Sequence, residues 1–173
     1  VTGTNGKTTT TNLVKSILEQ VTGELVGLIG TNKNVIGDIE EEAERTTPDS
    51  IELQSLFARM VERGCKYAVM EVSSHALYLD RTAGISFNVG AFTNLTEDHL
   101  DFHKTMEAYA EAKSRLFKAC RVGVINLDDG HACTMKKAAE CPILTFSTTK
   151  NEATFTAKDI RLGADDVSFR ILT

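Results

Sequence analysis

The segment at residues 3–10 reads GTNGKTTT, and its residue types suit the binding of a triphosphate. Its glycines lack a Cβ atom, so the backbone can adopt positive φ and approach phosphate oxygens closely. Lys7 supplies a charge for the β- and γ-phosphates, and the Thr8 hydroxyl can bind a magnesium ion. The ordinary Walker A pattern requires a glycine at position 1, where this chain has Val1. We therefore interpret the segment as a variant phosphate loop.

An acidic residue that could complete a magnesium site follows an apolar run. Residues 67–72 read YAVMEV and predict a buried strand with Glu71 near its end. Because the carboxyl ends of parallel strands gather where ligands bind, we expect Glu71 to face Thr8. The alternative is a solvated glutamate at a strand end.

Three further types of side chain that could bind a substrate or act in catalysis follow that strand. Ser73 and Ser74 could bind a substrate carboxylate or cap a short helix. His75 could act as a base, although a structural histidine is the more frequent case. Arg81 could form a bidentate pair with a carboxylate or could be an ordinary exposed arginine.

The stretch at residues 98–103 reads DHLDFH and is dense in potential metal ligands. His99 and His103 would share one face of a helix, but a zinc protease requires Glu after the first histidine, where this chain has Leu100. That excludes a zincin and leaves a single imidazole that assists a magnesium site. The two aspartates could instead only cap the turn.

Lys113 lies on the apolar face of a predicted helix at residues 105–119. A buried ammonium is costly unless it is paired or deprotonated. One alternative packs the aliphatic stem and keeps the head in water. The other is a neutral amine that reacts with CO₂ to give an anionic carbamate, which could bind a metal.

The elements that must position these residues alternate along the chain. Helices are expected at 7–20, from Thr47 or Pro48 to 63, 105–119 and 130–140, and strands at 25–29, 67–72, 86–95, 122–126 and 143–146. Residues 30–47 are interpreted as a loop, and the tail from Phe155 as a β-hairpin or meander. This alternation predicts an α/β fold with a mostly parallel sheet flanked by helices, similar to P-loop NTPases.

Composition narrows the class of protein. The 173 residues carry 24 acidic and 19 basic side chains without a basic block, so we expect no nucleic-acid partner. No apolar run approaches the ~20 residues that span a bilayer. The four cysteines show no Cys-x-x-Cys spacing and are interpreted as reduced thiols of a cytoplasmic protein. The loop lies too near Val1 for its preceding strand, so we expect a piece of a longer protein.

Five motifs occur in a fixed order along residues 1–147. They are GTNGKTTT at 3–10, TTP at 46–48, EVSSH at 71–75, FTNLTEDHLDFH at 92–103 and EAKSRLF at 111–117. Together they resemble the central ATP-binding domain of the Mur ligases. The resemblance is greatest to the MurE type, which adds the third amino acid of the peptidoglycan stem to UDP-MurNAc-dipeptide.

The resemblance implies a role for each matching position. ATP would be held by the loop residues Gly3, Thr4, Asn5, Gly6, Lys7, Thr8 and Thr9. One Mg²⁺ would be bound by Thr8 and Glu71, and a second by His99 and a carbamate on Lys113. The acidic end of UDP-MurNAc-dipeptide would be contacted by Thr46, Thr47, Ser73 and Arg81. The catalytic set would be Lys7, His99 and Lys113.

Two positions depart from the family pattern, and other functions stay open. Arg45 and Leu79 stand where some relatives have Asn and Gln, so no substrate contact is assigned to them. The UDP-binding and amino-acid-binding domains would lie outside residues 1–173, so this chain alone is expected to be inactive. Neither the added amino acid, diaminopimelate or lysine, nor the oligomeric state can be predicted. The alternatives are a folylpolyglutamate- or cyanophycin-type ligase and a non-catalytic nucleotide-binding module.

Overall fold

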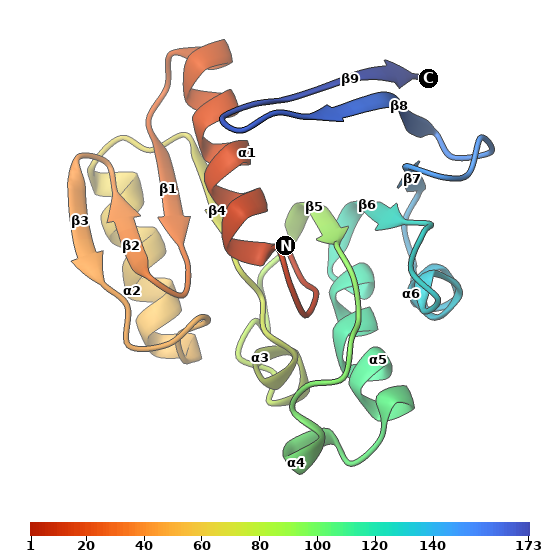
Figure 1. The fold of residues 1–173 in the computed structure, drawn as a ribbon. Coiled ribbons are helices and arrows are strands. Elements are labelled where there is room, and N and C mark those ends of the chain that lie inside the picture. The colour runs from red at the N-terminus through yellow and green to blue at the C-terminus, as the bar shows by residue number, and fades with distance from the viewer.

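The computed structural model describes residues 1–173, which form two β-sheets with helices packed around them (Figure 1). The first sheet has the order β3-β2-β1-β4, and the second has the order β5-β6-β7-β8-β9. The strands of the first sheet are β1 (Val26–Ile29), β2 (Lys33–Ile36), β3 (Ile39–Glu42) and β4 (Tyr67–Met70). Those of the second are β5 (Phe87–Phe92), β6 (Cys120–Asn126), β7 (Ile143–Ser147), β8 (Phe155–Leu162) and β9 (Val167–Leu172).

Strand directions confirm the expected α/β architecture. The pairs β1–β4, β5–β6, β6–β7 and β7–β8 are parallel, and only the hairpin connections are antiparallel. The expected C-terminal hairpin is present as β8 and β9. No helix of the structure is long and apolar enough to cross a membrane.

The helices begin and end near the expected residues. They are α1 (Lys7–Thr22), α2 (Ser50–Glu62), α3 (Ser74–Tyr78), α4 (Leu100–His103), α5 (Met106–Ser114) and α6 (Ala132–Ala138). The expected helix at 105–119 is divided, because α5 passes into a 3₁₀-helix, η1 (Arg115–Lys118). Helix α1 packs against β1 and β4, and α5 packs against α3 and α6.

The first two residues lie between the two sheets. Val1 donates to the Met70 carbonyl at 2.8 Å and accepts from the Val72 amide at 2.8 Å. Thr2 donates to the Ala91 carbonyl of β5 at 2.7 Å. The phosphate loop therefore starts between the carboxyl ends of β4 and β5, where a parallel sheet binds ligands.

Two details of the expected secondary structure are wrong. Residues 30–47 contain the hairpin β2–β3, which turns at Gly37 with φ 67°. The buried β2 lacks the alternation of a half-exposed strand, which is why the sequence pattern did not reveal it. The N-cap of α2 is Asp49, whose carboxylate accepts from two amides, and neither Thr47 nor Pro48 begins that helix. The Thr47 hydroxyl is used elsewhere, as described below.

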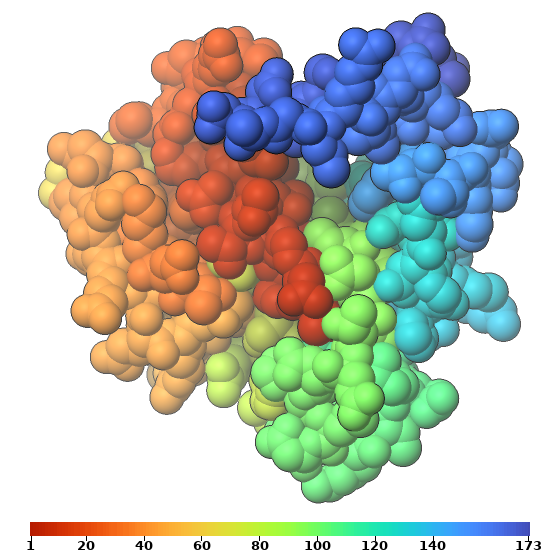
Figure 2. Space-filling view, in the orientation of Figure 1, coloured from red at the N-terminus to blue at the C-terminus, as the bar shows by residue number.

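Helix α1 exposes much of the apolar stripe that predicted it. Leu13 and Ile17 are each 58% exposed, and Val21 is 77% exposed. Figure 2 shows this helix, in red to orange, on the surface of the molecule. The periodicity identified the helix correctly, but it did not show that only one edge of the stripe would be covered.

The main hydrophobic core continues through both sheets, from β1, β2, β4 and α2 to β5, β6 and the helices α3, α5 and α6. Its members include the fully buried side chains of Phe92, Phe117 and Ile125. Burial of each such side chain contributes about 1.5–3 kcal/mol. Tyr109 belongs to the same core, so α5 is fixed against the sheet on the side that faces the phosphate loop.

Candidate functional site

The phosphate loop has the backbone geometry that its glycines predict. Gly3 has φ 150°, and a Cβ atom there would lie 1.9 Å from Thr93 Oγ1. Gly6 has φ 80° and precedes α1 without any side-chain cap. The first amides of α1 therefore stay available to an anion, to which the helix dipole also contributes.

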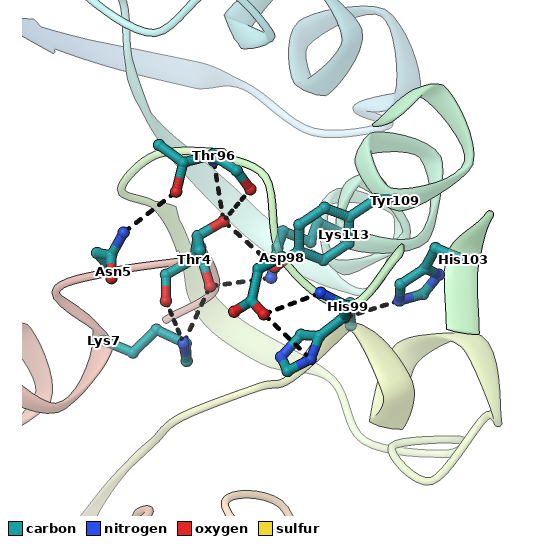
Figure 3. Close-up of polar contacts among 11 residues, drawn as sticks. Thr4, Asn5, Lys7, Thr96, Asp98, His99, His103, Tyr109 and Lys113 are labelled. Carbon is teal, nitrogen blue, oxygen red and sulfur yellow. Dashed lines mark hydrogen bonds and ion pairs between the residues drawn. The ribbon is translucent and has the colours of Figure 1, made fainter. Parts of the chain in front are cut away.

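Lys7 and Lys113 share one acceptor in this loop. The Gly3 carbonyl accepts from Lys7 Nζ at 3.0 Å and from Lys113 Nζ at 2.9 Å (Figure 3). Lys7 also donates to the Thr4 carbonyl at 2.8 Å. Burial lowers the pKa of Lys7 from its ordinary value. Two cationic side chains from α1 and α5 thus converge on a single peptide group.

Lys113 is buried rather than extended into water. It is 1% exposed, and its Nζ lies 4.5 Å from the centroid of the Tyr109 ring. Burial, and next the charge of Lys7, lower the pKa of Lys113 to about 7. The alternative with its head in water is therefore excluded, and a neutral amine is accessible near neutral pH.

Glu71 lies beside Thr8, as expected for a magnesium site. Its carboxylate is 1% exposed and accepts from Thr8 Oγ1 at 2.9 Å. The same carboxylate accepts from the Thr31 amide and hydroxyl, each at 3.0 Å. A solvated glutamate at a strand end is thus excluded. Thr31 was missed in the sequence, although its position just after β1 placed it at the same sheet edge.

The chemistry of these donors fits magnesium. Hydroxyl and carboxylate oxygens are the ligands that this hard cation prefers. A cavity of about 70 Å³ opens beside them, with Asn12, Gly30 and Lys33 in its lining. That volume can hold several waters, and Mg²⁺ usually keeps such waters.

The two histidines of residues 98–103 have different environments. His99 is the N-cap of α4 with φ 53°, so it does not share a helix face with His103. Its side chain stays half exposed, with Nδ1 3.4 Å from Asp98 Oδ1. His103 is buried, and its Nε2 lies 2.9 Å from Ser74 Oγ. Burial, and next the charge of His75, lower the pKa of His103 to about 4.

The threonine pair expected to contact an acceptor lies next to Glu71. Thr46 Oγ1 is 3.1 Å from Thr31 Oγ1. Thr47 Oγ1 donates to the Glu71 carbonyl at 2.9 Å and accepts from the Ser73 amide at 3.0 Å. The Thr47 hydroxyl therefore ties this loop to the end of β4.

Ser73 and Arg81 complete the same wall of the site. Ser73 Oγ caps α3 by accepting from the Ala76 amide at 3.2 Å, and its hydroxyl hydrogen stays available. One guanidinium N–H of Arg81 donates to the Thr47 carbonyl at 3.1 Å. The remaining N–H groups of Arg81 can still bind a carboxylate.

The loop after β5 fastens the phosphate loop from the opposite side. The Asn5 amide donates to Asn94 Oδ1 at 2.9 Å, and Asn5 Nδ2 donates to Thr96 Oγ1 at 3.2 Å. Thr4 Oγ1 accepts from the Thr96 amide at 3.0 Å. Thr9 is exposed on α1. Sequence reasoning did not assign a role to Asn94 or Thr96, although both belong to the FTNLT motif.

Comparisons with known proteins identify the family of this chain. The chain matches the Mur ligase middle domain over residues 1–173. A UDP-N-acetylmuramoyl-L-alanyl-D-glutamate–2,6-diaminopimelate ligase of Clostridium tetani is 52% identical over 171 residues, which are 99% of this chain and 35% of the relative. A Listeria monocytogenes ligase of the same name is 44% identical and covers 100% of this chain and 37% of the relative. The chain thus spans about a third of the length of these curated relatives.

Solved structures give the same result. A structure of a ligase with that name has a TM-score of 0.84 at 37% identity, covering 98% of this chain and 36% of the other. The MurF ligase of Thermotoga maritima in complex with ADP has a TM-score of 0.68 at 18% identity, covering 99% of this chain and 36% of the other. The MurF match shows the fold alone. From the family match and these relatives together, the chain belongs to the Mur ligase family and corresponds to its middle domain.

Proposed function

We propose that this chain is the ATP-binding part of a ligase that adds the third stem-peptide amino acid to UDP-MurNAc-L-Ala-D-Glu. One observation carries the proposal: the phosphate loop, the Thr8–Glu71 pair and the buried Lys113 meet near the carboxyl ends of β4 and β5, beside a wall suited to a carboxylate. The names of the relatives support 2,6-diaminopimelate as the added amino acid. The free cysteines fit a reducing compartment, which supports a cytoplasmic location.

The first step in this proposal transfers the γ-phosphoryl group of ATP to the acceptor carboxylate and gives an acyl phosphate. The amine of the amino acid then attacks the acyl carbon, and phosphate leaves. Bringing two anions together is the main barrier, so catalysis consists mostly of positioning and charge neutralisation. Lys7 and the amides at the start of α1 neutralise the phosphates in this scheme.

Thr8 and Glu71 would hold one Mg²⁺, and His99 with a carbamylated Lys113 would hold a second. The metal ions supply charge neutralisation on the phosphate oxygens. Carbamylation requires a neutral amine: the Lys113 nitrogen attacks CO₂, a proton is released, and an anionic N-carboxylate remains. The nitrogen keeps one N–H, so it can still donate to the Gly3 carbonyl. Carbamylation makes residue 113 anionic, so its repulsion by the Lys7 ammonium is replaced by attraction.

The acceptor wall would bind the terminal carboxylate of the dipeptide. Arg81 has N–H groups to spare, and the Ser73 hydroxyl can donate. Thr46 and Thr47 belong to the same wall and lie next to Glu71, so they place the acceptor carboxylate close to the metal site. Such pre-orientation can supply several kcal/mol of catalysis, with about 7–11 kcal/mol as the upper range.

The test measures ADP release by the full-length protein with UDP-MurNAc-L-Ala-D-Glu plus diaminopimelate, lysine or no amino acid, and with folate substrates. The proposal expects release that depends on the dipeptide and on diaminopimelate. Lys113→Ala should abolish ligation, with partial recovery in short carboxylates. Full activity of that variant without rescue would refute the carbamate role, and nucleotide binding without dipeptide-dependent release would indicate a regulatory module.

A further inference from the structure

His103 is a buried histidine that the proposed mechanism does not use. It is 5% exposed, and its imidazole lies among the rings of His75, Tyr78, Phe102 and Tyr109. Two of its contacts lead to the candidate site (Figure 3). Nε2 lies 2.9 Å from Ser74 Oγ. The ring stacks on Tyr109 with centroids 5.0 Å apart and an interplanar angle of 28°. A side chain that was introduced above only as a possible metal ligand thus joins two other parts of the molecule.

The first contact leads to the acceptor wall. Ser74 is 1% exposed and begins α3, directly after the α3 cap residue Ser73. Its hydroxyl makes one hydrogen bond, which is the bond to His103. A buried hydroxyl left without a partner costs about 1–3 kcal/mol, so this bond constrains where residues 71–75 lie.

The second contact leads to the phosphate loop. Tyr109 is 1% exposed, and its hydroxyl lies 3.2 Å from Thr4 Oγ1. Thr4 Oγ1 already donates its hydrogen to the Thr96 carbonyl at 3.3 Å, so the Tyr109 hydroxyl is the donor to Thr4. The Tyr109 ring also lies under Lys113 Nζ at 4.5 Å. The orientation of this ring therefore affects both the loop and Lys113.

We propose that His103 is a positioning residue that fixes residues 71–75, which carry Ser73 of the acceptor wall, relative to the phosphate loop. The bond to Ser74 holds one side, and the stack on Tyr109 holds the other. This inference rests on the proposed function, because the acceptor carboxylate must lie in line with the γ-phosphate for transfer. A displacement of residues 71–75 would also weaken binding of the dipeptide, because its carboxylate could no longer reach Arg81 and the Ser73 hydroxyl together.

Two substitutions at His103 separate the contacts. His103→Phe keeps an aromatic ring on Tyr109 but removes the bond to Ser74. His103→Gln keeps a nitrogen near the position of Nε2 but removes the stack. Ser74→Ala removes the same bond from the other side. The control is His131→Phe, because His131 is the N-cap residue of α6 and its side chain pairs with Asp129 rather than with residues 3–9 or 71–75.

Steady-state kinetics of the full-length ligase with the UDP-linked dipeptide and ATP test the proposal. His103→Phe and Ser74→Ala should each raise KM for the dipeptide about tenfold and leave KM for ATP within about twofold. The double variant should be no worse than either single variant, because both remove one interaction. His103→Gln should keep KM for the dipeptide and lower kcat about fivefold, because Tyr109 loses its stacking partner.

The outcomes that overturn the proposal are distinct. A residue that only stabilises the fold would lower kcat and the melting temperature and leave KM for the dipeptide unchanged in all three variants. Additive effects of His103→Phe and Ser74→Ala would show that they do not act through one bond. If the wild-type ligase shows no dipeptide-dependent ADP release, the proposed function fails as well. If the wild-type ligase is active but the His103 variants have the same KM and kcat as His131→Phe, this inference fails and the proposed function stands.

Discussion

The pH dependence of CO₂ uptake by Lys113 is the sharpest consequence of its burial. Only the neutral amine reacts with CO₂, and burial lowers the pKa of Lys113 from 10.5 to about 7. At pH 7 an ordinary lysine is about 0.03% neutral, whereas a group with a pKa of about 7 is about half neutral. Lys113 should therefore offer about 1,500 times more reactive amine than an exposed lysine. The carbamate of Lys113 should therefore increase as the pH rises from about 6 to about 8.

The measurement is ¹³C NMR of the protein under a fixed pressure of ¹³CO₂, recorded across pH. The carbamate resonance of Lys113 is the one that disappears in Lys113→Met. The exposed lysines of the same sample are the internal control, since their carbamates should form only at alkaline pH. If the Lys113 resonance first appears above about pH 9, together with the exposed lysines, the argument from burial is refuted.

Three other predictions follow from buried or strained groups. The free energy of unfolding of the wild type should rise by about 2–3 kcal/mol relative to that of Lys113→Met between pH 7 and pH 9, as measured by urea unfolding. The reason is that the unfolded chain binds the Lys113 proton up to about pH 10, whereas the folded chain releases it near pH 7. An unchanged difference between the two proteins would contradict the lowered pKa. Gly3→Ala should weaken ATP binding by calorimetry at least about 100-fold through its clash with Thr93, whereas the control Gly23→Ala, with φ 71° and open space, should cost only about 1 kcal/mol of stability. Asp49→Ala should lower the free energy of unfolding by about 1 kcal/mol through loss of the α2 cap, and an effect below a few tenths would show that the cap is replaced.

The sequence predicted those parts of the site that follow from local pattern and sheet topology. The glycine spacing revealed the loop, and the strand before Glu71 placed its carboxylate at the edge that faces Thr8. Lys113 stood out because a charged residue interrupted an apolar helix face. Each of these inferences needed only the periodicity of one element or the rule that parallel strands gather their carboxyl ends.

The remaining parts depend on paths of the backbone that no periodicity encodes. Thr31 reaches Glu71 across 40 residues, and the bond between His103 and Ser74 spans 29. The left-handed conformation of His99 separates it from His103, although a spacing of four suggested a shared helix face. The wrong cap at Thr47 has the same origin, because its hydroxyl satisfies the end of a distant strand.

The shared carbonyl of Gly3 makes the two lysines competitors. An oxygen with two lone pairs that already accepts from Lys7 and Lys113 binds each of them less strongly than it would bind either alone. Any anion that draws Lys7 away leaves Lys113 as the single donor, so the strength of one contact reports the occupancy of the other. The infrared stretching frequency of an isotope-labelled Gly3 carbonyl would shift when Lys7 leaves it. That frequency would therefore report whether an anion occupies the loop.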